Sequence, residues 1–119
     1  MNNAQSNFDL EERTFQFAKK VAQYVSKLPK TTSNIEYSKQ VIRASSSVGA
    51  NYREANEALG KKDFNMRLKI SRKEAKESSF FLRLIIETND DSFKKEGLEL
   101  FDEAEQLKKI FSAILLKTN

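Results

Sequence analysis

The sequence predicts an all-α protein, a single antiparallel up-and-down four-helix bundle that takes up residues 1–119. Apolar residues recur at alternating steps of three and four in four long segments, as on the buried face of an amphipathic helix. Only three glycines and one proline occur in the chain, whereas all-β domains need many of both for their turns. We expect helices at about residues 8–28, 34–59, 63–88 and 93–117, joined by short polar breaks.

The first two helices follow from their apolar seams and from the residues that flank them. The first seam consists of Leu10, Thr14, Phe17, Val21, Tyr24 and Leu28. Pro29 ends that helix because proline cannot continue the backbone hydrogen bonding. The second seam consists of Ile35, Ile42, Ser45, Val48 or Gly49, Tyr52, Ala55 and Leu59. Gly60 is the expected C-terminal stop.

The third and fourth helices show the same rhythm. Asp63 is a candidate cap for the third, whose seam consists of Phe64, Leu68, Ser71, Ala75, Ser78, Leu82 and Ile85. The fourth seam consists of Phe93, Gly97, Leu100, Ala104, Leu107, Phe111 and Ile114. Further apolar residues widen both faces: Phe80, Phe81, Leu84 and Ile86 on the third, and Phe101, Ile110, Leu115 and Leu116 on the fourth. Such an excess favours burial against a second copy of the chain, and the alternative is a wide core face.

The middle of the second helix has almost no side-chain bulk. Helical spacing continues through it, so it is not a loop, and it lacks the glycines and Lys-Ser/Thr of a phosphate-binding loop. Small residues let two helix backbones approach closely. The candidates for close packing are Ser45, Ser46, Ser47, Gly49 and Ala50. Their neighbour is either another helix of the bundle or another subunit.

A pattern of polar residues overlaps the small-residue segment of the second helix. Gln40, Arg43, Ser47, Asn51 and Glu54 share one face of the second helix, and Glu74 and Glu77 lie one turn apart on the third. We expect a buried Arg43 to pair with one of these carboxylates, with Gln40 and Asn51 completing the hydrogen bonds. The alternative is that these residues lie on a solvent-exposed surface and do not contact one another.

Basic residues are concentrated in the third helix. Residues 61–88 carry eight basic and four acidic side chains, so this segment alone has the net charge of +4 that the whole chain has. Lys62, Lys69, Lys73, Lys76 and Arg83 form one stripe, with Arg72 at its edge. These six residues are the candidate nucleic-acid-binding site, because a row of cations can follow a phosphate backbone. The alternative is a solvated face with local pairs such as Lys73–Glu77 and Arg83–Glu87. We expect no base stacking, since no aromatic residue alternates with these lysines.

The sequence lacks residues that several functional classes require. The chain has no cysteine and no histidine, so it offers no disulfide, no thiolate ligand and no imidazole base or ligand. We expect no enzyme, no cofactor and no metal site, although Glu54, Glu57, Glu74 and Glu77 leave carboxylate-only binding of Mg²⁺ or Mn²⁺ open. No apolar run is long enough to span a membrane, and the N-terminus is polar where a signal peptide would be apolar, so a cytoplasmic protein is expected.

Residues 8–117 resemble the four-helix-bundle family encoded within intervening sequences of bacterial 23S rRNA genes. The resemblance lies in QVIRASSSVGANYREA (residues 40–55), in Lys62-Asp63-Phe64 and ISRKEAKE (residues 70–77), and in FFLRL (residues 80–84). It implies a bundle that assembles into a ring, typically a homopentamer, without enzymatic activity. It also implies association with nucleic acid, because related retroelement accessory proteins bind RNA and a reverse transcriptase.

Two functions therefore remain. The first is a homo-oligomer that binds nucleic acid, with structured RNA as the expected ligand, through the basic stripe of the third helix. The second is a homo-oligomeric scaffold that docks a larger protein partner such as a reverse transcriptase. For the second, the acidic residues Glu96, Glu99, Asp102, Glu103 and Glu105 of the fourth helix would suit a basic partner.

Overall fold

The computed structural model describes residues 3–118, with side chains from residue 9 onward. It contains the helices α1 (Asn3–Val25), α2 (Thr32–Asn56), α3 (Lys61–Thr88) and α4 (Lys94–Thr118), and a 3-10 turn, η1 (Asp91–Phe93). These residues include no β-strand, so the prediction of an all-α chain with four helices is confirmed.

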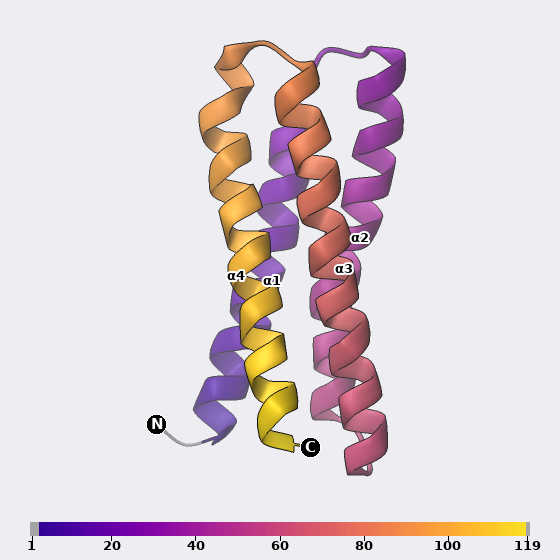
Figure 1. Cartoon of the computed structure of the whole chain (residues 1–119), viewed down its shortest axis with the longest axis vertical. Helices are drawn as coiled ribbons and strands as arrows, with labels where there is room; N and C mark the ends of the chain where they lie inside the picture. The colour runs from indigo at the N-terminus through magenta and orange to yellow at the C-terminus, as the bar shows by residue number, and fades with distance from the viewer. Residues whose placement is uncertain (1–2, 119) are drawn as a thin grey trace.

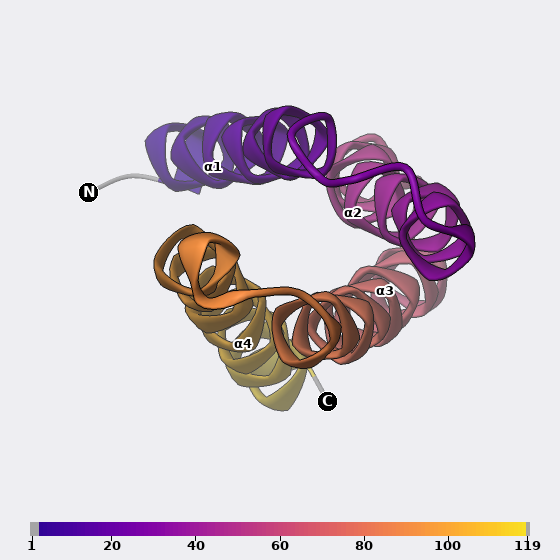
Figure 2. The same cartoon turned by 90° about the horizontal axis from the view of Figure 1, so that it is seen from above.

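The four helices lie side by side along a molecule of 45 × 25 × 19 Å (Figure 1). The α1–α2 and α3–α4 connections lie at one end of the molecule, and the α2–α3 turn lies at the other. Seen from above, the helices follow one another in chain order around the bundle, and α1 meets α4 less extensively than α3 meets its two neighbours (Figure 2). The outer faces of α1 and α2 are therefore on the opposite side of the molecule from those of α3 and α4.

Tight final turns explain where α1 and α2 end. The backbone N–H groups of Lys27 and Leu28 donate to carbonyls three residues back, as do those of Glu57 and Ala58. Both helices therefore end three residues earlier than predicted.

The connection between α2 and α3 differs from the prediction. Gly60 does not stop α2 but precedes α3 as its extended N-cap residue, and its carbonyl accepts the N–H of Phe64. Asp63 lies within the first turn of α3 rather than at the cap, where its charge favours the positive end of the helix dipole.

The predicted seams of α1, α3 and α4 form most of the core. All six seam residues of α1 are buried, and in α3 only Phe64 stays partly exposed. In α4 the residues from Gly97 to Phe111 on the seam are buried, while Phe93 and Ile114 pack at the margin of the core. Regular spacing of large apolar residues was sufficient to identify these faces.

The predicted seam of α2 is wrong at three positions. Ile35 and Ile42 are 45% and 41% exposed, and Leu59 is fully exposed beyond the end of the helix. Val41 and Ala44 are buried instead. One residue is a rotation of about 100° on a helix, so the isoleucines sit on the flank of α2 beside α1. The small residues of α2 fit several faces of the helix equally well. The apolar pattern alone therefore could not show which face is buried.

The small-residue segment of α2 packs within the bundle at Gly49. A Cβ placed there would lie 2.9 Å from Thr14 Oγ1 and 3.2 Å from Thr14 Cβ, so glycine permits the close approach of α1. Ser45 is buried as well, and Ser71 of α3 donates to the Val48 carbonyl at 2.9 Å. Ser46 and Ala50 are exposed and Ser47 is only half-buried, so for these three residues close packing stays a prediction that concerns another subunit.

We expect Gly49→Leu to lower the free energy of unfolding by about 1–3 kcal/mol, because the new side chain collides with Thr14. Ala50→Leu is the matched control, since it adds the same side chain to the exposed neighbouring position, and it should change stability by less than about 0.5 kcal/mol. Urea unfolding followed by circular dichroism measures both. Equal losses in the two variants would contradict a close contact specific to Gly49.

Candidate nucleic-acid interface

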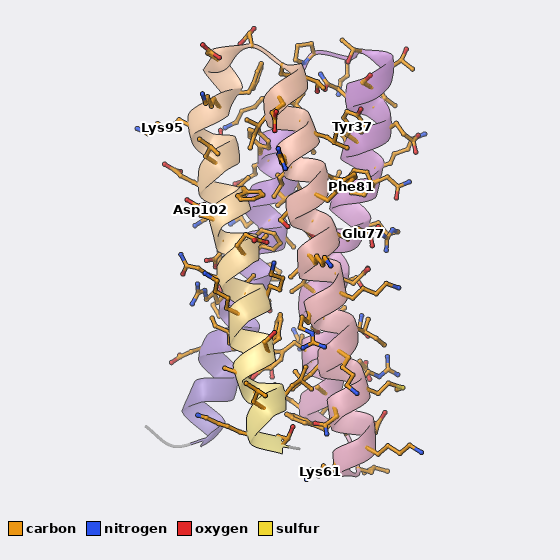
Figure 3. The ribbon with its side chains drawn as sticks, in the orientation of Figure 1. Tyr37, Lys61, Glu77, Phe81, Lys95 and Asp102 are labelled. Atoms are coloured by element: carbon orange, nitrogen blue, oxygen red, sulfur yellow. The ribbon has the colours of Figure 1, made fainter. Side chains whose placement is uncertain are left out.

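The six predicted cations lie on the outer side of α3. Lys62, Lys69, Lys73, Lys76 and Arg83 are exposed, and Arg72 is half-buried toward α4. From Lys62 to Arg83 the stripe extends about 31 Å along the helix axis, at 1.5 Å per residue. Figure 3 shows this side of the molecule with Lys61 at the lower end of α3.

Four of these residues border a groove between α3 and α4. The groove has a volume of about 690 Å³. We call it the basic groove; it is lined by Lys69, Arg72, Lys73 and Lys76 of α3 and by Lys108, Lys109, Ser112, Ala113 and Leu116 of α4. Six of its nine lining residues are therefore basic, and none is acidic.

Lys108 and Lys109 are the site residues that sequence reasoning missed. Their helix is acidic in its first half, and two adjacent lysines give no stripe of their own. A helical wheel of the fourth helix does place positions 108, 109, 112, 113 and 116 together, but which helix faces them depends on the packing of the bundle.

The charge of the basic groove is little compensated. Lys69, Lys73, Lys76 and Lys109 have no ion pair with any side chain that the structure describes. Lys108 pairs with Glu105 at 3.1 Å, and Arg72 donates a long hydrogen bond of 3.4 Å to the Ser112 hydroxyl. Like charges held close together with few counter-charges make a strong site for a polyanion.

The stripe extends beyond the groove at both ends. Lys62 borders a second hollow, of about 1110 Å³, on α3 together with Met66 and Ile70, and Lys69 and Lys73 line it as well. Arg83 lies at the other end and pairs with Glu87 at 2.7 Å, as the local-pair alternative expected. The expected Lys73–Glu77 pair is not formed, because Glu77 binds Arg43 of α2 instead.

The prediction that no aromatic residue accompanies the lysines is wrong. Phe80 lies four residues after Lys76 and three before Arg83, and 59% of its surface is exposed. The sequence placed Phe80 with its apolar neighbours on a face that a second copy would bury. Phe81 packs against the core and Ile86 lies against Gly97 of α4, but Phe80 points outward among the cations.

The expected polar network forms in part. Arg43 of α2 donates to Glu74 at 2.8 Å and also to Glu77, and hydrogen bonding to Glu74 above all raises the pKa of Arg43. The Glu74 side chain is only 7% exposed, whereas that of Arg43 is 52% exposed. Figure 3 shows Glu77 on the side of α3 that faces α2. These contacts fix how α3 is rotated against α2.

The remaining network residues lie elsewhere. Gln40 donates to Glu36 of its own helix, and Glu54 is exposed. Asn51 donates to Ser47 and accepts from Arg67 at 3.1 Å, so it belongs to a second, smaller cluster.

The acidic residues of α4 have different surroundings. Glu103 binds Arg13 of α1 through two hydrogen bonds of 2.7 and 2.8 Å, and Glu96 binds Lys27 at 2.9 Å. Glu99 and Asp102 are exposed, and Asp102 projects from the side of α4 in Figure 3. The acidic face thus holds α4 against α1 and is only partly open to solvent.

In the part of the chain that the structure describes, no three acidic side chains converge as a metal site requires. Helices able to cross a membrane are likewise not found in this part.

Comparisons with known proteins agree with the architecture. The family model described as 23S rRNA-intervening sequence protein matches residues 6–113. A crystal structure at 1.70 Å shows a similar chain: a protein of unknown function from the S23 ribosomal protein family of Bacteroides thetaiotaomicron VPI-5482. The TM-score is 0.79 at 26% sequence identity, over 92% of this chain and 96% of that one. Curated proteins give no significant match.

We expect Arg43→Ala to lower the free energy of unfolding by about 1–2 kcal/mol, because the buried Glu74 carboxylate loses its partner. This expected loss of stability is at the low end for a buried ion pair, because water reaches the half-exposed Arg43 side chain. Arg83→Ala is the control: its pair with Glu87 is exposed on both sides, and its loss should cost less than about 0.5 kcal/mol. Urea unfolding of both variants tests the difference, and equal effects would show that the Arg43 contacts do not hold α3 against α2.

Proposed function

Because the chain belongs to the family of 23S rRNA-intervening sequence proteins, we propose that it is a non-enzymatic, homo-oligomeric protein that binds structured RNA. The observation that carries the proposal is the basic groove, in which four lysines have no ion pair with a described residue. Lysines that contact the phosphates would release the cations condensed along the RNA backbone, and this release is a large source of affinity in such complexes.

The groove suits a phosphate backbone better than a compact ligand. It is open along the helices, and its cations come from both walls over two turns of α3. Its three uncharged lining residues are Ser112, Ala113 and Leu116, whose side chains offer a single hydroxyl group for hydrogen bonding. Such a surface recognises charge and shape and gives little discrimination between bases in a duplex.

Self-association would use the opposite side of the molecule. An apolar face runs along α1 and α2, which we call the α1–α2 face; its members are Phe15, Ala18, Ala22, Val25, Ile35, Ser38, Ile42 and Ser46. Phe15 is 57% exposed, a large apolar area to leave in water. A second copy that covers this face would leave the basic groove open, because the groove lies across the bundle (Figure 2).

Assembly would also strengthen RNA binding. Each copy has a short groove whose contacts are individually weak and sensitive to salt. In a ring, such as the pentamer that the family resemblance implies, a bound RNA that touches one groove meets the next at a high effective concentration.

The scaffold alternative is favoured by one observation. Glu99 and Asp102 are exposed on α4 without an ion pair to any described side chain, and Leu98 beside them is 41% exposed. This surface would suit a protein partner with a basic edge. It lies on the same helix as Lys108 and Lys109, so a single partner with both protein and RNA components could contact both regions.

We expect the double substitution Lys69→Glu and Lys76→Glu to abolish binding to a structured RNA while the oligomer keeps its size, because both residues line the groove. The matched control is Lys94→Glu with Lys95→Glu, which changes the net charge equally at the exposed start of α4. Fluorescence anisotropy across a salt series should show a loss of at least about two units of log–log slope for the groove variant only. Equal weakening by both variants would show that net charge, not the groove, binds RNA.

We expect Ile42→Asp to dissociate the oligomer, since it places a carboxylate in the centre of the α1–α2 face. Leu98→Asp is the matched control: both side chains are 41% exposed in the single chain, but Leu98 lies on α4. Light scattering coupled to size-exclusion chromatography gives the mass of each variant. Assembly that survives Ile42→Asp and is lost with Leu98→Asp would move the interface to α4.

A further inference from the structure

Phe80 is an exposed aromatic ring inside a basic surface. Lys76 precedes it by four residues and Arg83 follows it by three, so all three project from the outer side of α3. Along the helix axis the two cations lie about 6 Å and 4.5 Å from Phe80. Lys76 is also the last α3 residue that lines the basic groove, which places the ring about one turn beyond the end of the groove.

The ring is held in a defined orientation. Phe80 and Phe81 meet edge to face, with ring centroids 5.3 Å apart and an angle of 83° between their planes. Phe81 in turn packs against Tyr37 of α2 at 6.4 Å, and Figure 3 shows this pair side by side between α3 and α2. Edge-to-face contacts of this kind are favourable, so Phe80 is supported from one side while its remaining surface is open.

Cover by a second copy of the chain is an unfavourable explanation for this exposure. A partner that buried Phe80 would also enclose Lys76, for which the structure describes no ion pair, and Arg83 with its Glu87 partner. Removing these charges from water without new partners is costly. The hollow along the α1–α2 face is lined by Lys30 and Lys39 beside nine uncharged residues, so covering it removes less charge from water for each apolar residue that it buries.

We infer that Phe80 is a stacking platform for an unpaired nucleobase, and that the RNA therefore carries single-stranded nucleotides beside the part held in the groove. This inference rests on the proposed RNA-binding function. An aromatic ring between two cations offers a base a flat apolar surface while the cations contact the phosphates on either side. In a duplex the base faces are already stacked and are not accessible, so a wholly paired RNA gains nothing from the ring.

The test compares two RNAs: a single-stranded oligouridylate, and a blunt duplex with the same number of phosphates. For Phe80→Ala we expect affinity for the oligouridylate to fall roughly 5- to 140-fold, the range for loss of one stacked base. Affinity for the duplex should stay within twofold, and the salt slope should not change, because no charge is removed. Leu59→Ala is the control: Leu59 is a fully exposed apolar residue in the connection between α2 and α3 and does not line the groove, so its substitution should leave both affinities unchanged.

A second variant gives a direct signal. The chain has no tryptophan, so Phe80→Trp introduces a single fluorophore at the proposed contact. Its emission should be quenched by the oligouridylate and unaffected by the duplex.

Three results would overturn the inference while the proposed function stands: equal loss of both RNAs by Phe80→Ala, no loss of either, or a change in oligomer mass in that variant. If the unaltered protein bound neither RNA, the proposed function and the stacking role would both be wrong.

Discussion

The two bonds from Arg43 to Glu74 and Glu77 determine how α3 presents its charges. Both carboxylates lie on the α2 side of the helix, and both are engaged by a single guanidinium. The outer side of α3 from Lys69 to Lys76 is consequently left with cations and no acid to neutralise them. If Glu77 had paired with Lys73, as its position four residues later permits, the groove would have lost one of its four unpaired lysines. An interaction that aligns two helices thus also creates the electrostatic field of the proposed site.

Charge separation continues on α4. Its first half carries acidic residues, and two of these bind Arg13 of α1 and Lys27 just beyond the end of α1. Its second half carries Lys108 and Lys109 beside the cations of α3. A net charge of +4 is small for the proposed role in RNA binding, but ion pairs elsewhere neutralise charges of both signs and leave the positive excess in the basic groove. Local charge, more than net charge, decides where a polyanion binds.

The sequence predicted the parts of the fold that large apolar side chains specify. In α1, residues such as Phe17, Val21 and Tyr24 mark one face without ambiguity, and all of them are buried. In α2 the central residues are small, so the pattern could not distinguish the buried face from one turned by a single residue, and Ile42 was misplaced. The stripe on α3 could be predicted because it lies within one helix. The groove could not be predicted, because it depends on how the helices are rotated in the bundle. Only that rotation brings Lys73 of α3 close to Lys108 and Lys109 of α4.

The two principal surfaces of the molecule have different chemistry and lie on opposite sides. Covering the largely apolar α1–α2 face would gain free energy by removing it from water, whereas the proposed phosphate binding would gain from the release of cations condensed on the RNA. These processes respond oppositely to salt: burial of apolar surface is insensitive to it or strengthened, and phosphate binding is weakened. The proposed self-association and the proposed RNA binding should therefore respond differently to ionic strength, and at high salt we expect the oligomer to persist without RNA. Gly49 connects the two sides, because the close contact of α2 with Thr14 of α1 holds the apolar face together while the other flank of α2 carries Arg43 toward α3.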